Sequence, residues 1–180
     1  NSKGKPNTIG SFAGPYDILN DPVFLSTLDD RDWKAGISEA IKVALIKDKV
    51  FFDWIKRHIP QLNDRDLETM NRLIFRCAEM HLQHIAGAGD PFEQGSSRPL
   101  DFGHWAAHKL EQFSNFEIRH GEAVAIGIAL DTAYSYLKGL LDEASMKEVL
   151  DCILDLGLPV FDNHLDRQIL VGLEEFREHL

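Results

Sequence analysis

The chain has 180 residues, of which 44% are hydrophobic and 27% are charged, and its formal net charge is −10 at pH 7. This length and composition are typical of one soluble globular domain with a substantial core. The negative charge argues against a nucleic-acid-binding protein, because such proteins carry clustered basic side chains. An acidic surface can still hold a small basic pocket for a phosphorylated ligand.

The cysteine content and the absence of long apolar runs indicate the expected compartment. Cys77 and Cys152 lie within apolar helical patterns and are expected to be small core residues. Without a disulfide framework or a Cys-x-x-Cys motif, a cytoplasmic location is expected. No apolar run reaches about 18 residues, so we expect no membrane-spanning helix and no membrane partner. A chain that shows no signal peptide and begins with Asn1 is expected to be a fragment, a processed product or a trimmed chain.

The pattern along the chain predicts an all-α fold. Residues 1–22 are rich in Gly, Pro, Ser and Asn, which predicts loops and turns ahead of a helical domain over residues 23–180. Beyond them, apolar residues recur at helical spacing, and no stretch alternates with period 2. We expect a bundle of six to eight helices and an irregular loop over residues 86–100. The first predicted helix begins after the N-cap Asp30, and the second begins near Asp48 and stops at Pro60. Further helices are predicted over about 63–85, 103–112 and 120–137, around Met146–Leu154, and over 165–180.

The stretch from Asp101 to Glu122 concentrates the chemically reactive side chains. His104 and His108 are four residues apart, so they share one face of the predicted helix. His120 begins the next apolar segment, where a chain returning from a turn could meet this pair. Three imidazoles with a nearby carboxylate suit zinc binding or acid–base catalysis. The same spacing is also compatible with surface or helix-capping histidines.

Glu39 and Lys42 lie three residues apart on the first long predicted helix and therefore on roughly one face. The pair is compatible with a solvated ion pair. Glu39 stands between two isoleucines, however, and a buried carboxylate needs a metal or a basic partner. A carboxylate with two imidazoles and an open fourth position is typical of a catalytic zinc site. Glu39, His104 and His120 would make such a set, with His108 left as acid, base or substrate donor.

Four segments resemble the C-terminal helical domain of the dehydroquinate synthase family, the sugar phosphate cyclases. Residues 36–55 (GISEAIKVALIKDKVFFDWI) resemble the family's Gly-x-x-Glu-x-Ile-Lys helix and its continuation. Residues 102–111 (FGHWAAHKLE) resemble its Gly-His-x-x-x-His-x-x-Glu element, and residues 119–128 (RHGEAVAIGI) resemble its His-Gly-Glu helix. Residues 7–12 (NTIGSF) resemble the turn that joins the family's two domains. The matches occur in family order and cover most of the chain.

The resemblance implies a metal site and a reaction. By motif position Glu39, His104 and His120 would bind zinc, or another divalent ion such as Co²⁺. In the family a hydroxyl carbon is oxidised with NAD, phosphate is eliminated, the hydride returns and an intramolecular aldol closes the ring. No segment of these residues resembles the family's N-terminal nucleotide-binding domain with its glycine-rich turn. NAD binding is therefore expected only in a full-length protein, for which the family also implies a homodimer.

Other residues are expected to contact a small phosphorylated sugar or sugar acid. By motif position these are Lys42, His108 near the phosphate or hydroxyls, and Asn7. Dehydroquinate synthases grip the substrate carboxylate with an arginine and an asparagine ahead of the Gly-His pair. Here Arg98 lies one residue closer to the Gly-His pair than the family's arginine does, and Asp101 occupies the position where the asparagine is expected. An aspartate would repel a carboxylate, which favours a substrate without one, such as sedoheptulose 7-phosphate.

We assign Lys42, His108, Arg98 and Asp101 as candidate catalytic residues. Two alternatives stay open besides the choice of sugar phosphate. One is an iron- or zinc-dependent alcohol dehydrogenase, which has a related two-domain plan but a different ligand motif. The other is a non-catalytic helical interaction module whose histidines are structural.

Overall fold

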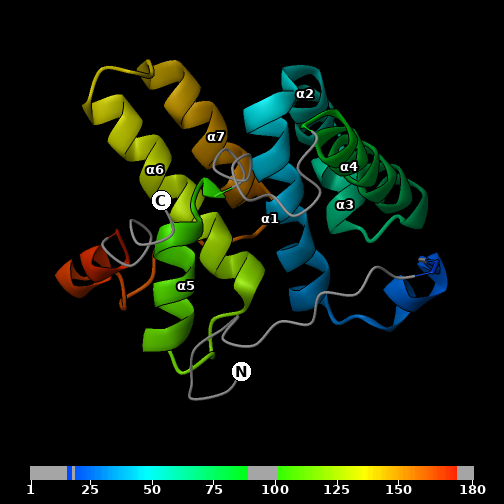
Figure 1. Ribbon diagram of the computed structural model, residues 1–180, viewed down its shortest axis with the longest axis horizontal. Coiled ribbons are helices and arrows are strands. Elements are labelled where there is room, and N and C mark those ends of the chain that lie inside the picture. The colour runs from blue at the N-terminus through cyan, green and yellow to red at the C-terminus, as the bar shows by residue number, and fades with distance from the viewer. Residues whose placement is uncertain (1–15, 18, 89–100, 174–180) are drawn as a thin grey trace.

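The computed structural model describes residues 16–17, 19–88 and 101–173, and within them the chain forms helices and no strand (Figure 1). This confirms the predicted all-α class. The described α-helices are α1 (Asp30–Lys47), α2 (Lys49–Arg57), α3 (Ile59–Asn63), α4 (Leu67–Ala88), α5 (His104–Phe113), α6 (His120–Leu137) and α7 (Glu143–Asp155), with 3-10 helices η2 (Pro22–Thr27) and η4 (Arg167–Leu170).

Some helix ends differ from those predicted. Asp30 is the first residue of α1, and Asp29 is the N-cap, whose side chain accepts a hydrogen bond from the Asp32 N–H at 2.8 Å. Pro60 does not end a helix: α2 stops at Arg57, and Pro60 lies in the first turn of α3, where its missing N–H costs no hydrogen bond. The predicted helix over 165–180 is described only in part, as η4 followed by helical residues 171–173.

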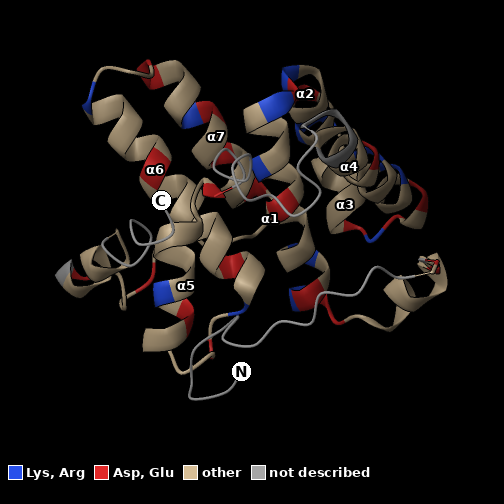
Figure 2. Ribbon diagram, in the orientation of Figure 1, with Lys and Arg blue, Asp and Glu red and all other residues tan. Residues whose placement is uncertain are grey.

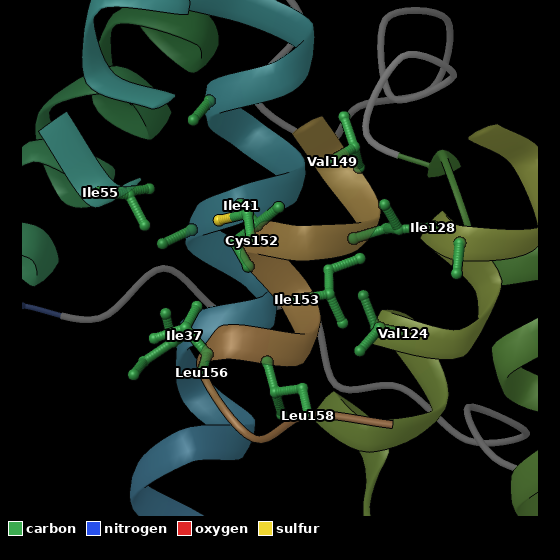
Figure 3. Packing of buried hydrophobic residues seen from close by; sticks show 14 of the residues in the cluster. Ile37, Ile41, Ile55, Val124, Ile128, Val149, Cys152, Ile153, Leu156 and Leu158 are labelled. Atoms are coloured by element: carbon green, nitrogen blue, oxygen red, sulfur yellow. The ribbon is translucent and has the colours of Figure 1, made fainter. Parts of the chain in front are cut away.

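A central part of the core lies where α1, α6 and α7 meet (Figure 3). The apolar residues of α1 recur at helical spacing and therefore present one stripe to the other two helices. Full burial of a branched aliphatic side chain contributes about 1.5–3 kcal/mol to stability. The side chains labelled in Figure 3 include Ile37 and Ile41 from α1, Val124 and Ile128 from α6, and Val149, Cys152 and Ile153 from α7.

Glycines let two neighbours approach the backbone of α6 closely. A Cβ added at Gly121 would lie 2.0 Å from the carbonyl oxygen of Ala35 on α1. A Cβ added at Gly127 would lie 1.9 Å from the carbonyl oxygen of Gly103, which precedes α5. Only glycine fits at either position. Through these two contacts, α1 and the start of α5 both pack closely against α6.

Charged residues are spread over the described helices. In Figure 2 acidic and basic residues are interspersed along the described helices, without a basic stripe along any of them. Among the described residues, no helix combines the length and the apolar character needed to cross a membrane.

Candidate metal centre

Three helices each place one predicted ligand at the same point. Glu39 comes from α1, His104 from the first residue of α5 and His120 from the first residue of α6. Glu39 Oε1 lies 3.3 Å from His104 Nε2 and 3.2 Å from His120 Nε2. One ligand atom from each of the three residues lies within 4.8 Å of the others. The structure thus brings the three residues together, and their role as metal ligands stays a prediction.

The close approach of α6 to α1 explains why Glu39 and His120 meet. Gly121 follows His120 directly, and its contact with Ala35 occurs one helical turn before Glu39. A side chain at Gly121 would push the first turn of α6 away from α1. The glycine of the His-Gly-Glu motif is therefore required by packing, and the packing sets the position of His120.

Glu122 fastens the same turn of α6 to α1. Its two carboxylate oxygens accept hydrogen bonds from Nε and Nη2 of Arg31, each at 2.6 Å, and Oε2 also accepts one from the Arg119 N–H at 2.9 Å. Burial opposes ionisation of Glu122, but the hydrogen bonds from Arg31 and Arg119 outweigh it and lower the pKa of this carboxyl. A bidentate ion pair therefore holds the helix end that carries His120.

Asp131 fixes the start of α5 around His104. Its Oδ2 accepts a hydrogen bond from the Gly103 N–H at 2.8 Å, and its Oδ1 accepts one from the indole N–H of Trp105 at 2.9 Å. Gly103 has a φ of 78°, a left-handed conformation that favours glycine. Burial raises the pKa of Asp131, and the two hydrogen bonds oppose that rise. The residues on both sides of His104 are thus held by one partly buried side chain of α6.

The Nδ1 atoms of both histidines face hydrogen-bond acceptors. His104 Nδ1 lies 3.2 Å from the carbonyl oxygen of Phe102, and His120 Nδ1 lies 3.0 Å from Glu111 Oε2. A carbonyl or an ionised carboxylate only accepts, so each Nδ1 carries a proton. In the neutral imidazoles the Nε2 lone pairs then point at Glu39 Oε1, which is another acceptor. Three acceptor atoms that face one another repel. The contact becomes favourable only with positive charge, which either an additional proton on the imidazoles or a metal ion among the three atoms can supply.

The distances fit a tetrahedral ion. Zinc bonds of about 2.0–2.1 Å at tetrahedral angles place neighbouring ligand atoms about 3.3–3.4 Å apart. The two separations from Glu39 Oε1 are 3.3 and 3.2 Å. One carboxylate oxygen and two imidazole nitrogens also leave a fourth position for water or substrate, as in catalytic zinc sites. The residues present therefore fit zinc.

Lys42 adds positive charge beside these ligands. Its Nζ lies 2.6 Å from Glu39 Oε2 and 3.5 Å from His104 Nε2, and its side chain is only 8% exposed. Burial opposes ionisation of Glu39, but hydrogen bonds from His104 and His120 and the charge of Lys42 hold its pKa far below the usual range. Hydrogen bonds to Glu111 and Glu39 raise the pKa of His120 to about 9. Glu39 is thus ionised at neutral pH, and its negative charge favours a cation at this point.

His108 lies next to the two candidate histidine ligands. Its ring centroid lies 5.6 Å from that of His104 and 6.0 Å from that of His120. Burial, together with the charge of His104, lowers the pKa of His108, so its imidazole is neutral at pH 7. A neutral imidazole can both accept and donate a proton.

A pocket of about 550 Å³ opens beside the cluster between α1 and α4. Glu39, Lys42, Asp101 and His104 all line it, so Asp101 faces the same cavity as two candidate ligands. Cys77 also lines the pocket, but burial and the nearby charge of Glu39 raise the pKa of its thiol to about 11. A thiol of that pKa is not a nucleophile at neutral pH.

Two predicted substrate-contacting residues, Asn7 and Arg98, lie outside the described residues. Their positions relative to the cluster therefore stay predictions. The buried Cys152 is a core residue, as expected, and the partly buried Cys77 packs against the core.

Comparison with known proteins identifies the family. Residues 36–174 match the family model described as 3-dehydroquinate synthase C-terminal. The chain belongs to the 3-dehydroquinate synthase family. This confirms the resemblance seen in its motifs, and places the chain among the sugar phosphate cyclases.

Relatives of known name support the assignment. The chain is 36% identical over 173 residues to 3-dehydroquinate synthase from Nitrosospira multiformis, an alignment that covers 94% of this chain and 47% of that protein. It is 34% identical over 155 residues to 3-dehydroquinate synthase from Coxiella burnetii, with 86% of this chain and 43% of that protein covered. The chain thus spans about half the length of the curated relatives it matches.

A solved structure shows the same architecture. ValA, the 2-epi-5-epi-valiolone synthase from Streptomyces hygroscopicus subsp. jinggangensis, matches with a TM-score of 0.91 and 31% sequence identity. The match covers 99% of this chain and 50% of that one, and the ValA structure has NAD⁺ and Zn²⁺ bound.

Several residues that build the site were not recognised as functional in the sequence. Glu111 ends the Gly-His-x-x-x-His-x-x-Glu motif of this dehydroquinate synthase domain, and its spacing from His104 places both on one helix face. Asp131 is the single acidic residue among residues 123–137, and a lone carboxylate in such a helix signals a buried partner. The pairing of Arg31 with Glu122 joins residues far apart in the sequence, and no local signal indicates it.

Proposed function

We propose that this chain is the metal- and substrate-binding part of a zinc- and NAD-dependent sugar phosphate cyclase, a lyase that resembles 3-dehydroquinate synthase. The observation that carries the proposal is the convergence of Glu39 Oε1 with two Nε2 atoms whose Nδ1 protons are already engaged. The likeness to ValA, whose structure has both NAD⁺ and Zn²⁺ bound, supports it. Because the chain spans half of ValA, NAD would be bound mainly by the part of such a protein that lies outside this chain. We expect the full-length protein to be cytoplasmic.

The proposed reaction oxidises a hydroxyl carbon of the substrate, eliminates phosphate, reduces the carbon again and closes the ring by an intramolecular aldol. Zinc held by Glu39, His104 and His120 would supply a Lewis acid that lowers the cost of negative charge on substrate oxygens. Lys42, buried beside Glu39, would stabilise charge developing on the same oxygens. His108 would accept and return a proton, because its imidazole is neutral at pH 7.

Asp101 favours a particular substrate class within this reaction type. Its carboxylate lines the pocket together with Glu39, so a substrate carboxylate entering there would meet like charge. A sugar phosphate without a carboxylate, such as sedoheptulose 7-phosphate, avoids that repulsion. The structural likeness to a 2-epi-5-epi-valiolone synthase agrees with this second candidate, whereas the curated relatives agree with dehydroquinate synthesis.

The test is a paired substrate assay on a protein that carries this chain together with a nucleotide-binding domain. Release of inorganic phosphate is followed with NAD and zinc present, from sedoheptulose 7-phosphate and from the heptulosonate phosphate used by dehydroquinate synthases. We expect turnover of at least one, with sedoheptulose 7-phosphate preferred and Asp101→Asn shifting the preference towards the heptulosonate. Turnover of the heptulosonate alone would refute the role of Asp101. No turnover of either, with zinc bound, would refute the proposed activity and favour the interaction module.

A further inference from the structure

The face of α5 that carries His104 has a third member. His104, His108 and Glu111 are spaced at i, i+4 and i+7, so they lie along one side of the helix. Glu111 is largely buried, with a side chain that is 15% exposed, and its Oε2 lies 3.0 Å from His120 Nδ1. Glu111 is not among the residues proposed to bind metal or substrate.

The turn between α5 and α6 brings His120 back to Glu111. Asn115 and Phe116 both adopt left-handed conformations, with φ of 50° and 64°. The Phe116 N–H donates to the carbonyl oxygen of Glu111 at 2.7 Å, which closes the end of α5. The chain therefore reverses within a few residues, and the first residue of α6 returns to the side of α5 on which Glu111 lies.

Packing alone holds His120 less firmly than His104. The side chain of His120 is 45% exposed, whereas that of His104 is 13% exposed. An exposed imidazole at the start of a helix has several ring orientations open to it unless hydrogen bonds select one. The contacts that select one here are Glu111 at Nδ1 and Glu39 at Nε2.

We propose that Glu111 is a positioning residue of the metal centre, which binds the Nδ1–H of His120 and thereby directs Nε2 to the metal. This inference rests on the proposed function. Metal-bound histidines commonly donate their second N–H to a carboxylate, which fixes the tautomer and increases the basicity of the ligand. The geometry also allows a competing arrangement, because donor atoms of His108, Glu111 and His120 lie within 4.8 Å of one another. In that arrangement Glu111 would itself be a ligand, and His120 would bind metal through Nδ1.

The experiment compares zinc affinity in the wild-type chain and in Glu111→Gln, Glu111→Ala and Glu117→Gln. Glu117 lies exposed in the turn between α5 and α6 and serves as the matched control. Zinc dissociation constants are measured by competition with a chromophoric chelator. We expect Glu111→Ala to weaken binding by about 10- to 100-fold and Glu111→Gln to weaken it less, because an amide oxygen still accepts a hydrogen bond. Glu117→Gln should match the wild type.

A second readout follows the ring of His120 directly by ¹⁵N NMR of histidine-labelled protein. In the zinc-bound wild type we expect Nε2 to be the metal-bound nitrogen and the Hδ1 proton to exchange slowly, and this slow exchange should be lost in Glu111→Ala. The proposal is overturned if Glu111→Ala binds zinc as tightly as the wild type, or if two zinc ions bind with His120 attached through Nδ1. If the wild type binds no zinc, the proposed function fails at its metal site. In that case Hδ1 exchange in the metal-free protein still decides whether Glu111 holds His120: equal exchange in Glu111→Ala overturns the contact, and faster exchange supports it.

Discussion

The carboxylate of Asp131 on α6 accepts a hydrogen bond from the backbone N–H of Gly103, the residue that precedes His104, at 2.8 Å. Its second oxygen binds the indole N–H of Trp105, the residue that follows His104. In the opposite direction, Glu111 on α5 contacts His120 on α6. Each of these two helices thus carries one candidate ligand and the carboxylate that orients the ligand of the other.

Loss of the Asp131 carboxylate should affect both stability and metal binding. Asp131→Ala removes the acceptor of two partly buried hydrogen bonds, and an unsatisfied donor that is buried costs about 1–3 kcal/mol. We expect the free energy of unfolding in urea to fall by about 2–4 kcal/mol and zinc affinity to fall with it. Asp151→Ala, at an exposed position on α7, is the control and should change little. Equal effects of the two substitutions would contradict the role of Asp131.

The close contact between α6 and α1 should make a side chain at Gly121 destabilising. In Gly121→Ala the new methyl group would meet the Ala35 carbonyl oxygen, so the helices must separate. Overpacking of this kind costs about 1–3 kcal/mol, and zinc should bind more weakly because His120 moves away from Glu39. In Gly36→Ala, where an added Cβ meets nothing within 4 Å, the free energy of unfolding should instead rise by about 0.5–1 kcal/mol. Urea unfolding of both variants tests this, and a stable Gly121→Ala protein with unchanged zinc affinity would disprove it.

Lys42 should separate metal binding from catalysis. Its ammonium contacts Glu39 Oε2, whereas Oε1 is the oxygen that faces the two histidines. In a protein that carries this chain together with a nucleotide-binding domain, Lys42→Met should therefore retain zinc while phosphate release falls by about 10²- to 10³-fold, the usual effect of removing one charge-stabilising donor. Lys147→Met, on the exposed side of α7, is the control. If Lys42→Met loses zinc as completely as a ligand variant does, Lys42 belongs to the metal site and has no separate catalytic role.

We expect the ionisation of Asp48 to make the free energy of unfolding depend on pH. It caps α2 through the Phe51 N–H at 3.0 Å and pairs with Arg76 of α4 at 2.6 Å. The hydrogen bond from Arg76, followed by that from the backbone N–H of Phe51, lowers the pKa of Asp48 below its unfolded value of about 3.9. The stabilisation by ionised Asp48 is therefore fully present above about pH 3.9 and is lost as pH falls through the lower folded pKa.

Asp48→Asn tests this dependence, because asparagine still caps a helix but carries no charge. At pH 7 the wild type should have the larger free energy of unfolding, and the difference should shrink towards zero in acid. Urea unfolding of both proteins from pH 7 to about pH 2 measures it. A difference that does not change with pH would show that the charge of Asp48 contributes nothing.

The sequence indicates the features that depend on local spacing. Helical periodicity predicted α6 with its observed bounds, His120–Leu137, and the four-residue spacing of His104 and His108 placed both on one face of α5. The predicted helix end at Pro60 was wrong. Proline breaks a helix in its interior but fits well in a first turn, and Pro60 lies in the first turn of α3.

Relationships between helices could not be predicted in this way. Nothing near Gly121 in the sequence shows that Ala35 will approach it, because the contact depends on how α1 and α6 cross. The pairing of Glu111 with His120 likewise needs the left-handed turn at Asn115, a conformation that a residue other than glycine adopts only in context. The candidate ligands were predicted from residue type and spacing and from the motif resemblance, whereas the residues that orient them are visible only in the structure.

Zinc content tests the central claim most directly. The chain is stripped of metal, incubated with zinc, dialysed and analysed for metal, in parallel with Glu39→Gln, His104→Ala and the control His164→Ala, whose histidine pairs with Asp162 away from the candidate ligands. We expect about one zinc ion per chain for the wild type and for His164→Ala, and loss of zinc from the two ligand variants. A wild type that retains no zinc, or a His104→Ala protein that retains as much as the wild type, would contradict the assignment of Glu39, His104 and His120 as a metal centre.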